Sequence, residues 1–256
     1  MKPQRRIEKI TKWISAYAKK YDINALVVGI SGGIDSSVVS TLCARSGLYT
    51  LVVSMPIRQS KLTHSLSLAH GKWLEENYPN ADHYTIDLTK TFAQFENVTG
   101  TFSDELAYAN SRARLRMMCL YQLAQANNGI VVGTGNRVED FGVGFFTKYG
   151  DGGVDISPIA DLMKSEVWAL GKQLGVLQDI IDAEPTDGLW ADGRTDEGQL
   201  GMTYSELERA MIQVEQSLPN NKGNDYKNIL KYQELRKRNM HKMLPIPVCK
   251  MPDSLL

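Results

Sequence analysis

Residues 26–39 constrain the fold of this chain more than any other stretch. They begin with an apolar run, Leu26 to Ile30, that lacks the alternation of apolar and polar residues typical of a half-exposed strand. Such a run predicts a strand covered on both faces, as in a parallel sheet. Val38, Val39 and the following apolar residues predict a helix. The glycines between the two segments therefore predict a tight strand-to-helix turn.

The residue types in this turn are those of an anion site. Backbone N–H groups at a helix N-terminus face outward, and the helix dipole favours a negative charge there. Gly32 and Gly33 can take positive φ and let a phosphate approach the main chain, and Ser31 and Ser36 add hydroxyl donors. Asp35 is unexpected beside a phosphate unless a cation lies between them, so we assign it to Mg²⁺. A Walker loop is excluded because no Gly-Lys-Ser/Thr follows the glycines.

Composition excludes several classes of protein. The chain has 256 residues, enough for one large or two small domains. Its 29 basic and 29 acidic residues balance, so nothing predicts a nucleic-acid partner or an anionic membrane surface. Cys43, Cys119 and Cys249 are widely spaced without a CxxC motif, which argues against zinc and favours reduced thiols in the cytoplasm. No apolar run has membrane-spanning length, and no signal peptide is present.

Strand and helix patterns alternate along the rest of the chain. This alternation predicts an α/β fold, a doubly wound and mostly parallel sheet flanked by helices of the Rossmann-like kind. We expect residues 89–104 to form a loop at the edge of the active site or a short helix, and residues 187–203 to lie in a mobile lid. The predicted strands are residues 49–55, 84–88 and 129–133, and the predicted helices are residues 4–21, 62–74, 105–127, 162–174, 204–218 and 226–242.

A second acidic residue is predicted at the same edge of the sheet as Asp35. Thr134 and Glu139 follow the strand at residues 129–133. Because ligands bind beyond the carboxyl ends of parallel strands, these residues leave their strand on the side where Asp35 leaves its own. Two carboxylates from separate strand ends can share one Mg²⁺, with the oxygens of a bound phosphate completing its coordination.

Charged residues in three further places are candidates for substrate binding. Arg114 borders the apolar face of the longest predicted helix, where a guanidinium suits phosphate or carboxylate recognition or is simply solvated. The glycine-rich loop at residues 145–155 presents Lys148 and Asp155. Lys164 lies in the first turn of a helix, where its charge opposes the dipole; this indicates either an anion nearby or simply an exposed lysine, which is common at such positions.

The order of motifs resembles that of the NAD synthetases, in their ammonia-dependent form, within the superfamily of N-type ATP pyrophosphatases. The Lys-Tyr-Gly-Asp-Gly-Gly loop is the most specific element. The resemblance runs from about Gln4 to the C-terminal tail, and its motifs are Gly29-Ile30-Ser31-Gly32-Gly33-Ile34-Asp35-Ser36, Arg-Ala-x-x-Arg-Met ending at Met117, Gly133-Thr134 with Glu139, Phe146-Thr147-Lys148-Tyr149-Gly150-Asp151-Gly152-Gly153, Glu184-Pro185-Thr186 and His241-Lys242.

The resemblance implies an adenine nucleotide alpha hydrolase-like fold and the amidation of deamido-NAD to NAD with ammonia and ATP. The reaction passes through an adenylated intermediate and releases AMP and pyrophosphate. Asp35, Lys164 and Asp155 would be catalytic, and Asp35 and Glu139 would bind Mg²⁺. The residues implied for ATP are Gly29, Ile30, Ser31, Gly32, Gly33, Ile34, Asp35, Ser36, Thr134, Lys164 and Thr186, and those for deamido-NAD are Arg114, Lys148, Asp155, His241 and Lys242.

One departure from the family pattern bears on the metal site. The family often has Asp-His-Ala-Ala between the threonine and the glutamate, and here Gly135-Asn136-Arg137-Val138 replaces it. The stretch from Glu139 to Lys148 is also one residue longer. The resemblance further implies a homodimer with the dinucleotide at the subunit interface. We expect residues 1–256 to form a single synthetase domain without an N-terminal glutaminase domain.

Three other functions are compatible with the first motif alone. A GMP-synthetase-type amidase and a tRNA-thiolating enzyme share the superfamily loop. The tRNA-thiolating enzyme would need a basic surface for tRNA or catalytic cysteines, and neither is evident in this sequence. A nucleotide-sensing protein could keep the loop without its chemistry. The combined presence of Asp35, Glu139 and Lys164 argues against such a sensor.

Overall fold

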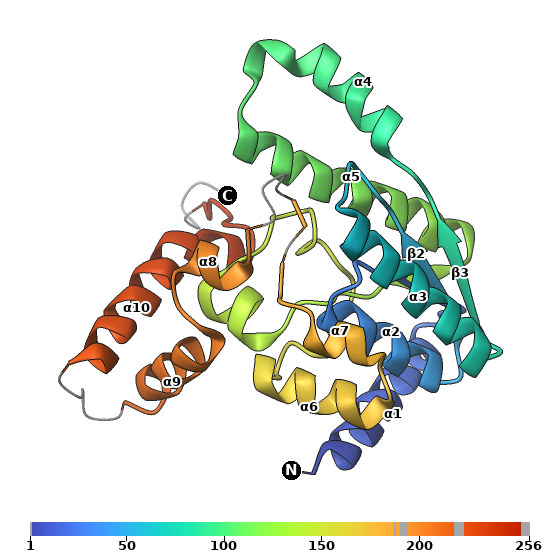
Figure 1. Ribbon diagram of the computed structural model, residues 1–256, viewed down its shortest axis with the longest axis horizontal. Helices are drawn as coiled ribbons and strands as arrows, with labels where there is room; N and C mark the ends of the chain where they lie inside the picture. Colours follow the sequence, from blue (N-terminus) through green and yellow to red (C-terminus); the bar gives the residue numbers. More distant parts are fainter. Residues whose placement is uncertain (1, 187, 190–193, 218–222, 252–256) are drawn as a thin grey trace.

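The computed structural model describes residues 2–186, 188–189, 194–217 and 223–251 (Figure 1). Strands and helices alternate through the first half of the chain, and helices alone make up most of the second half. The elements are α1 (Pro3–Lys20), β1 (Ala25–Gly29), α2 (Ile34–Arg45), β2 (Tyr49–Ser54), α3 (Lys61–Asn77), β3 (Ala81–Thr85), α4 (Thr89–Thr99), the 3₁₀ turn η1 (Gly100–Phe102), α5 (Glu105–Ala126), β4 (Gly129–Val131), the π-helical turn η2 (Arg137–Val143), α6 (Lys164–Leu174), α7 (Gln178–Asp182), α8 (Asp196–Leu200), α9 (Tyr204–Glu215) and α10 (Asn224–Met243).

The sheet has four strands in the order β3-β2-β1-β4, and every pairing is parallel among the described strands. Its centre is β1, where Val27 pairs with Leu51 on one side and Val131 on the other. The carboxyl ends of all four strands therefore meet at one edge, and the α/β fold class predicted from the sequence is confirmed.

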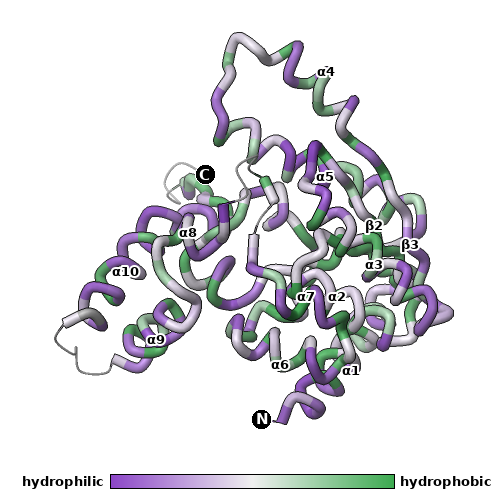
Figure 2. Tube along the Cα trace, in the orientation of Figure 1, coloured by the Kyte–Doolittle hydropathy of each residue, from purple (hydrophilic) through white to green (hydrophobic). Residues whose placement is uncertain are grey.

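Helices cover both faces of the sheet, which gives three layers. Because side chains alternate along a strand, Leu26 and Val28 face one core while Val27 faces the other. The first core lies against α2 and α3, with α1 and α6 packed outside them, and the second lies against α4 and α5. Figure 2 shows hydrophobic residues concentrated around the sheet, whereas α10 is largely hydrophilic.

A third apolar core holds the C-terminal helices together. It joins η2 to α8, α9 and α10, with Leu207, Met211 and Tyr232 among its buried side chains. In Figure 1 these helices form a lobe on the side of the molecule away from β2 and β3. Since η2 also follows β4, it connects this lobe to the carboxyl edge of the sheet.

One predicted strand differs in position from the structure, and the structure decides between two alternatives elsewhere. The third strand is Ala81–Thr85 and not residues 84–88, because its register pairs Ser54 with Thr85 and leaves Leu88 to pack in the second core. Residues 89–104 form α4 and η1, the short-helix alternative of the prediction. Within the predicted lid, α8 is helical, while residues 187 and 190–193 lie outside the described residues, as does residue 218 of the predicted helix 204–218.

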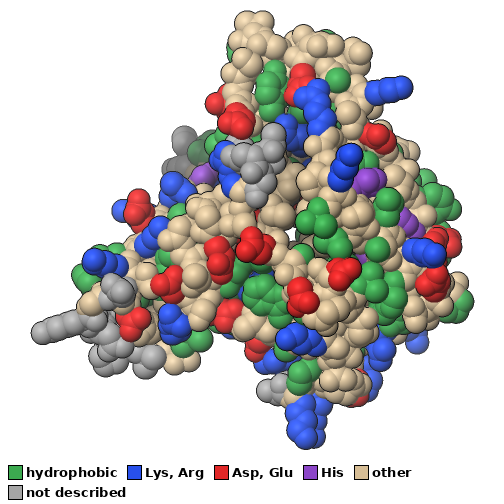
Figure 3. All heavy atoms as spheres, viewed as in Figure 1, with side chains coloured by type: hydrophobic (Ala, Val, Ile, Leu, Met, Phe, Trp, Pro, Cys, Tyr) green, Lys and Arg blue, Asp and Glu red, His purple; other side chains and the backbone are tan. Residues whose placement is uncertain are grey.

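Helix α1 packs on the domain through its apolar side. Ile7 and Ile14 are buried in the first core, and α1 contacts α2 and α6. Figure 3 shows basic side chains gathered around the end of the molecule where α1 begins. Across the described residues, none of the helices combines the length and the hydropathy needed to span a membrane.

Candidate functional site

The turn between β1 and α2 depends on Gly32 for its shape. Gly32 has φ of +88°, and a Cβ there would lie 2.5 Å from the Thr63 carbonyl oxygen of α3. Gly33 instead has φ of −90°, so positive φ holds for only one of the two glycines for which it was predicted. Packing against α3, together with the left-handed backbone, therefore requires glycine at position 32.

Serine side chains hold this turn at the N-terminal end of α2. Ser36 Oγ accepts the Ser31 N–H at 3.2 Å and donates to the Gly33 carbonyl at 3.0 Å, while Ser31 Oγ accepts the Gly33 N–H at 3.2 Å. Ile30 and Ile34 are buried in the first core, so only their backbone groups could meet a phosphate. The turn thus gathers hydroxyl and N–H groups where the helix dipole favours an anion.

The two predicted metal carboxylates meet at Lys164. Its Nζ lies 2.5 Å from Asp35 Oδ2 and 2.8 Å from Glu139 Oε1. The Lys164 side chain is 2% exposed, and those of Asp35 and Glu139 are 17% and 14% exposed. The nearby anions that the position of Lys164 predicted are therefore these two carboxylates. Because both contact one nitrogen, they are close enough to share a single ion.

Burial and attraction oppose each other in this cluster. Desolvation favours the neutral carboxyl and raises the pKa of Asp35, an effect that Lys164 offsets only in part. Desolvation acts on Glu139 too, but attraction and a hydrogen bond from Lys164, with the Tyr204 hydroxyl, bring the pKa of Glu139 below its ordinary value. The two carboxylates in turn outweigh burial at Lys164 and raise its pKa, which keeps the ammonium charged.

Asn136 and Tyr204 complete the cluster, and the sequence analysis missed both. The fully buried Asn136 accepts the Val138 and Glu139 N–H groups at 3.0 Å through Oδ1 and donates to Asp35 Oδ1 at 3.0 Å. The Tyr204 hydroxyl donates to Glu139 Oε1 at 2.5 Å. Asparagine before a helical turn is a capping signal that could have been noticed, whereas the start of α9 gives no sign of a distant carboxylate.

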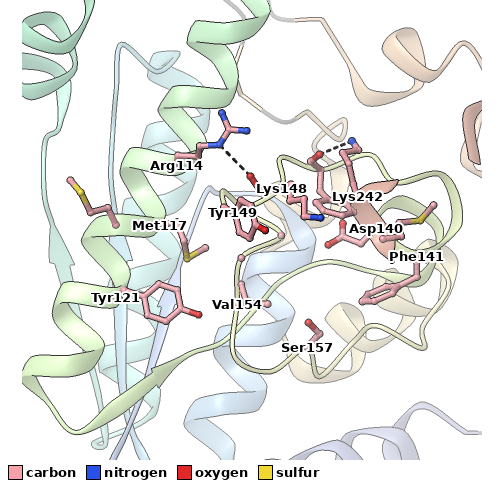
Figure 4. A pocket seen from close by; sticks show the side chains of 15 residues that line it. Arg114, Met117, Tyr121, Asp140, Phe141, Lys148, Tyr149, Val154, Ser157 and Lys242 are labelled. Atoms are coloured by element: carbon pink, nitrogen blue, oxygen red, sulfur yellow. Dashed lines mark hydrogen bonds between the residues drawn. The ribbon is translucent and has the colours of Figure 1, made fainter. Parts of the chain in front are cut away.

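A cavity of about 610 Å³ lies beside the cluster, between α5 and α10 (Figure 4). Arg114, Lys148 and Lys242 line it. Arg114 Nε donates to the Lys148 carbonyl at 3.2 Å, Lys148 Nζ to the His241 carbonyl at 3.3 Å, and Lys242 Nζ to the Phe146 carbonyl at 2.8 Å. The structure thus brings three predicted substrate cations together, while the exposed His241 takes part through its carbonyl.

Asp140 also lines this cavity and explains part of the departure from the family pattern. A Cβ on Gly135 would lie 1.9 Å from Asp140 Oδ2, so glycine at 135 and aspartate at 140 depend on each other. Burial raises the pKa of Asp140 well above its ordinary value, and repulsion from Asp151 and Glu139 adds to the effect. Neither position was a predicted site residue.

Three predicted residues are held outside the charged cluster. Asp155 accepts the Val131 N–H at 2.8 Å and the Tyr121 hydroxyl at 3.0 Å, so its carboxylate is engaged beside α5 and β4. Thr186 Oγ1 donates to the Arg194 carbonyl at 3.1 Å, within its own loop. Thr134 is half-buried between β4 and η2. The Asp155 carboxylate is thus held beside Tyr121, which lines the cavity, and its catalytic role stays a prediction.

Comparison with known proteins identifies the family. The model of the NAD synthase family matches residues 6–245. The NH(3)-dependent NAD(+) synthetase of Methanosarcina acetivorans is 34% identical, over 94% of this chain and 95% of its own. That of Alkaliphilus metalliredigens is 40% identical, over 79% of this chain and 84% of its own.

Solved structures agree over nearly the whole chain. The NMN synthetase of Francisella tularensis is 33% identical, with a TM-score of 0.86 over 99% of both chains. The NH3-dependent NAD synthetase of Campylobacter jejuni, at 24% identity, supports the fold with a TM-score of 0.79 over 98% of this chain and 100% of its own. The chain therefore belongs to the NAD synthase family, which confirms the family and the carbon–nitrogen ligase class that its motifs predicted.

Proposed function

We propose that this chain converts deamido-NAD to NAD with ammonia and ATP, the last step of NAD biosynthesis. The observation that carries the proposal is the convergence of Asp35 and Glu139 on Lys164 at the N-terminal end of α2. This cluster lies next to a cavity lined by Arg114 and two lysines, so a phosphate site and an anion-binding cavity adjoin. An adenylating ligase needs that combination, because ATP and an anionic acceptor must meet.

The residues present fit a Mg²⁺ ion held by Asp35 and Glu139. Both offer carboxylate oxygens, the donors that Mg²⁺ prefers, and both reach one point in space. Within the described parts of the chain, no group of three or more His, Cys, Asp or Glu side chains could hold a metal by itself. The ion would accordingly depend on phosphate oxygens as well, and when bound it would neutralise charge on the departing pyrophosphate.

The β1–α2 turn supplies the phosphate contacts in this proposal. Residues 29–36 form the triphosphate site, in which N–H groups of the turn and the hydroxyls of Ser31 and Ser36 bind phosphate oxygens, with Lys164 beside them; the Ile30 N–H instead donates to the Val53 carbonyl at 2.9 Å. Thr134 and Thr186 contact the remainder of ATP. The turn acts by fixing the direction in which pyrophosphate leaves and by stabilising its charge.

Cations around the cavity bind the second substrate. Arg114 of α5, Lys148 of the glycine-rich loop and Lys242 of α10 all line the same cavity (Figure 4). They suit the pyrophosphate and the nicotinate carboxylate of deamido-NAD, because both groups are anionic. His241 and Asp155 stand at the margins of this arrangement as further proposed contacts.

The reaction proceeds in two displacements. A nicotinate carboxylate oxygen attacks the α-phosphorus of ATP, the bond to the bridging oxygen of the β-phosphate breaks, and pyrophosphate leaves with the electron pair. Ammonia then attacks the acyl carbon of the resulting anhydride, and AMP leaves with the electron pair of the carbon–oxygen bond. The nitrogen sheds one proton to give the neutral amide of NAD.

A homodimer is the proposed working form. The exposed side of α5 and its neighbour α4 carry large apolar side chains, among them Met118 at 65% and Val98 at 82% exposure. An apolar groove lined by Leu88, Leu115 and Met118 continues to the substrate cavity, which Met118 also lines. A second copy of the chain on this face would bury the groove and close the cavity, which places the dinucleotide at the interface.

We also propose that ammonia, and not glutamine, is the nitrogen donor, that residues 1–256 act as one synthetase domain, and that the enzyme works in the cytoplasm. The curated relatives named above are NH(3)-dependent. The three cysteines are free thiols, in agreement with a reducing compartment.

A second candidate substrate is the mononucleotide of nicotinic acid. The NMN synthetase of Francisella tularensis matches this chain with a higher TM-score than the Campylobacter jejuni NAD synthetase, 0.86 against 0.79, and at 33% against 24% identity. Amidation of the mononucleotide would use the same adenylating cluster and the nicotinate end of the cavity. The two substrates differ only in the adenylate half, so their direct competition decides between them.

The test is incubation of the chain with ATP, Mg²⁺, ammonium and deamido-NAD, with each component omitted in turn. We expect NAD, AMP and pyrophosphate in equal amounts, and no product without Mg²⁺. A parallel reaction with nicotinic acid mononucleotide gives the ratio of kcat/KM for the two acceptors. Pyrophosphate release with neither acceptor, or product formation without Mg²⁺, would contradict the proposal.

A further inference from the structure

Tyr204 connects the catalytic cluster to the C-terminal lobe through its hydroxyl. Its side chain is 3% exposed and lies in the third core, where its ring meets Trp168 edge-on at 5.8 Å. The hydroxyl donates to Glu139 Oε1 at 2.5 Å and also approaches Asp196 Oδ2 at 3.3 Å. The shorter contact has the better geometry for the single O–H proton.

The backbone around Tyr204 ties two helices to this contact. The Tyr204 N–H donates to Glu197 Oε1 of α8 at 2.8 Å, and Thr203 caps α9 through its hydrogen bonds with Glu206. Asp196 begins α8. Consequently the starts of α8 and α9 are fixed relative to one another, and the Tyr204 hydroxyl fixes both relative to Glu139.

Glu139 has few other restraints on its direction. Its Oε1 accepts hydrogen bonds from Lys164 and Tyr204, and its backbone N–H is capped by Asn136. Lys164 and Asn136 both bind Asp35 as well as Glu139, whereas the short contact of the Tyr204 hydroxyl is with Glu139 alone among the two carboxylates. Losing that contact would weaken the restraint on the Glu139 carboxylate without disturbing the sheet or the β1–α2 turn.

We propose that Tyr204 is a positioning residue that orients Glu139 toward the shared cation and couples cation–ATP binding to the order of α8. The proposal rests on the proposed function, since it assumes that Glu139 is a magnesium ligand. None of the family motifs includes Tyr204. Through it, α8 and the start of α9 respond to the binding of Mg²⁺ and ATP at the carboxyl edge of the sheet.

The experiment compares Tyr204→Phe with Tyr232→Phe in the full chain. The first change removes one hydroxyl and keeps the ring beside Trp168 and Lys164. The second removes a hydroxyl from the same core, where Tyr232 contacts Arg236 and not Glu139. Calorimetric ATP binding over a series of Mg²⁺ concentrations, without an acceptor substrate, gives the Mg²⁺ requirement of each variant.

We expect Tyr204→Phe to raise the required Mg²⁺ concentration about tenfold, the size of a lost hydrogen bond to a charged group. Tyr232→Phe should leave the required Mg²⁺ concentration within about twofold of the wild-type value. An increase of less than about threefold in Tyr204→Phe overturns the positioning role. So does an equal increase in both variants.

Hydrogen exchange of α8 provides a second readout that does not depend on a variant folding. In the wild-type protein Mg²⁺ with ATP should slow amide exchange in Asp196–Leu200, and unchanged exchange there overturns the coupling. Glu139→Gln distinguishes a failure of the proposed magnesium site from a failure of the role proposed for Tyr204. If it leaves the Mg²⁺ requirement unchanged, the metal role in the proposed function fails; if it raises the requirement while Tyr204→Phe does not, only the role of Tyr204 fails.

Discussion

Helix α2 contributes to two buried polar clusters, one made of charged side chains and one made of neutral side chains. In its first turn Asp35 joins Glu139 and Lys164, a set of three formal charges held together by ion pairs of 2.5 and 2.8 Å. Further along the helix, Ser40 Oγ meets His70 Nε2 at 2.9 Å, and burial lowers the pKa of His70 to about 4, so this contact is neutral at pH 7.

The neutral cluster serves packing. A similar pair, Ser54 Oγ with His83 Nε2 at 2.9 Å, joins β2 to β3, and Ser54 also donates to Ser67 of α3 at 3.2 Å. Together these contacts join α2 to α3, β2 to β3, and α3 to the sheet without an ionic charge. The charged cluster costs more to bury, because each ion loses its hydration. Its location at the carboxyl edge of the sheet indicates that the charges are kept for ligand binding.

The largest expected effect comes from breaking the charged cluster. Lys164→Met leaves two buried carboxylates facing each other and should lower the free energy of unfolding by about 3–5 kcal/mol at pH 7. Chemical denaturation measures this loss. If the two carboxylates share a cation site, millimolar Mg²⁺ should restore part of the lost stability in this variant. NaCl at the same ionic strength should not. Absence of any Mg²⁺ effect would contradict a shared site.

The neutral cluster should respond to pH instead. Because the pKa of His70 is about 4 in the folded state and 6.5 ordinarily, the unfolded chain takes up a proton first as the pH falls. Stability from this residue is complete above about pH 6.5 and is lost toward pH 4, with a loss of about 2 kcal/mol at pH 5. Between pH 7 and pH 5, the free energy of unfolding of His70→Gln should therefore fall by about 2 kcal/mol less than that of the wild-type protein. Urea denaturation midpoints at the two pH values measure the difference. Equal losses in both proteins would show that His70 is not the group responsible.

The smallest expected effect is that of removing the Ser40 hydroxyl from the neutral cluster. Ser40→Ala removes the neutral hydrogen bond to His70 together with the contacts of the same hydroxyl to the Ser36 and Ser37 carbonyls, and should lower the free energy of unfolding by about 1 kcal/mol. Its kcat and its Mg²⁺ requirement should match the wild-type values, because Ser40 lies on the α3 side of the helix. Thermal unfolding and steady-state kinetics check both statements. A catalytic defect without a stability change would mean that the two clusters are not independent.

The sequence predicted the parts of the fold and site that local patterns encode. The apolar run at β1, the glycine turn and the start of α2 depend on neighbouring residues, so their types suffice to predict them. The meeting of Asp35 and Glu139 was predicted because parallel strands end at one edge of a sheet. The ion pairs of Lys164 with both carboxylates were not predicted.

Other parts depend on tertiary contacts that no local pattern records. The start of β3 is set by its register with β2, which places Ala81 opposite Thr50. Tyr204 lies far along the chain from Glu139, and its hydroxyl reaches the cluster only after the third core has formed. Asp140 is similar, since only the structure shows that it fills the space left by Gly135.

The central claim is that Asp35 and Glu139 bind a magnesium ion together with the ATP held by the β1–α2 turn. Asp35→Asn tests it most directly, because the change keeps the shape and removes the charge. Measured as pyrophosphate released from ATP in the presence of deamido-NAD and ammonium, turnover should fall at least about a thousandfold while the folded structure persists by circular dichroism. Turnover within about tenfold of the wild-type rate, with the same Mg²⁺ dependence, would contradict the account.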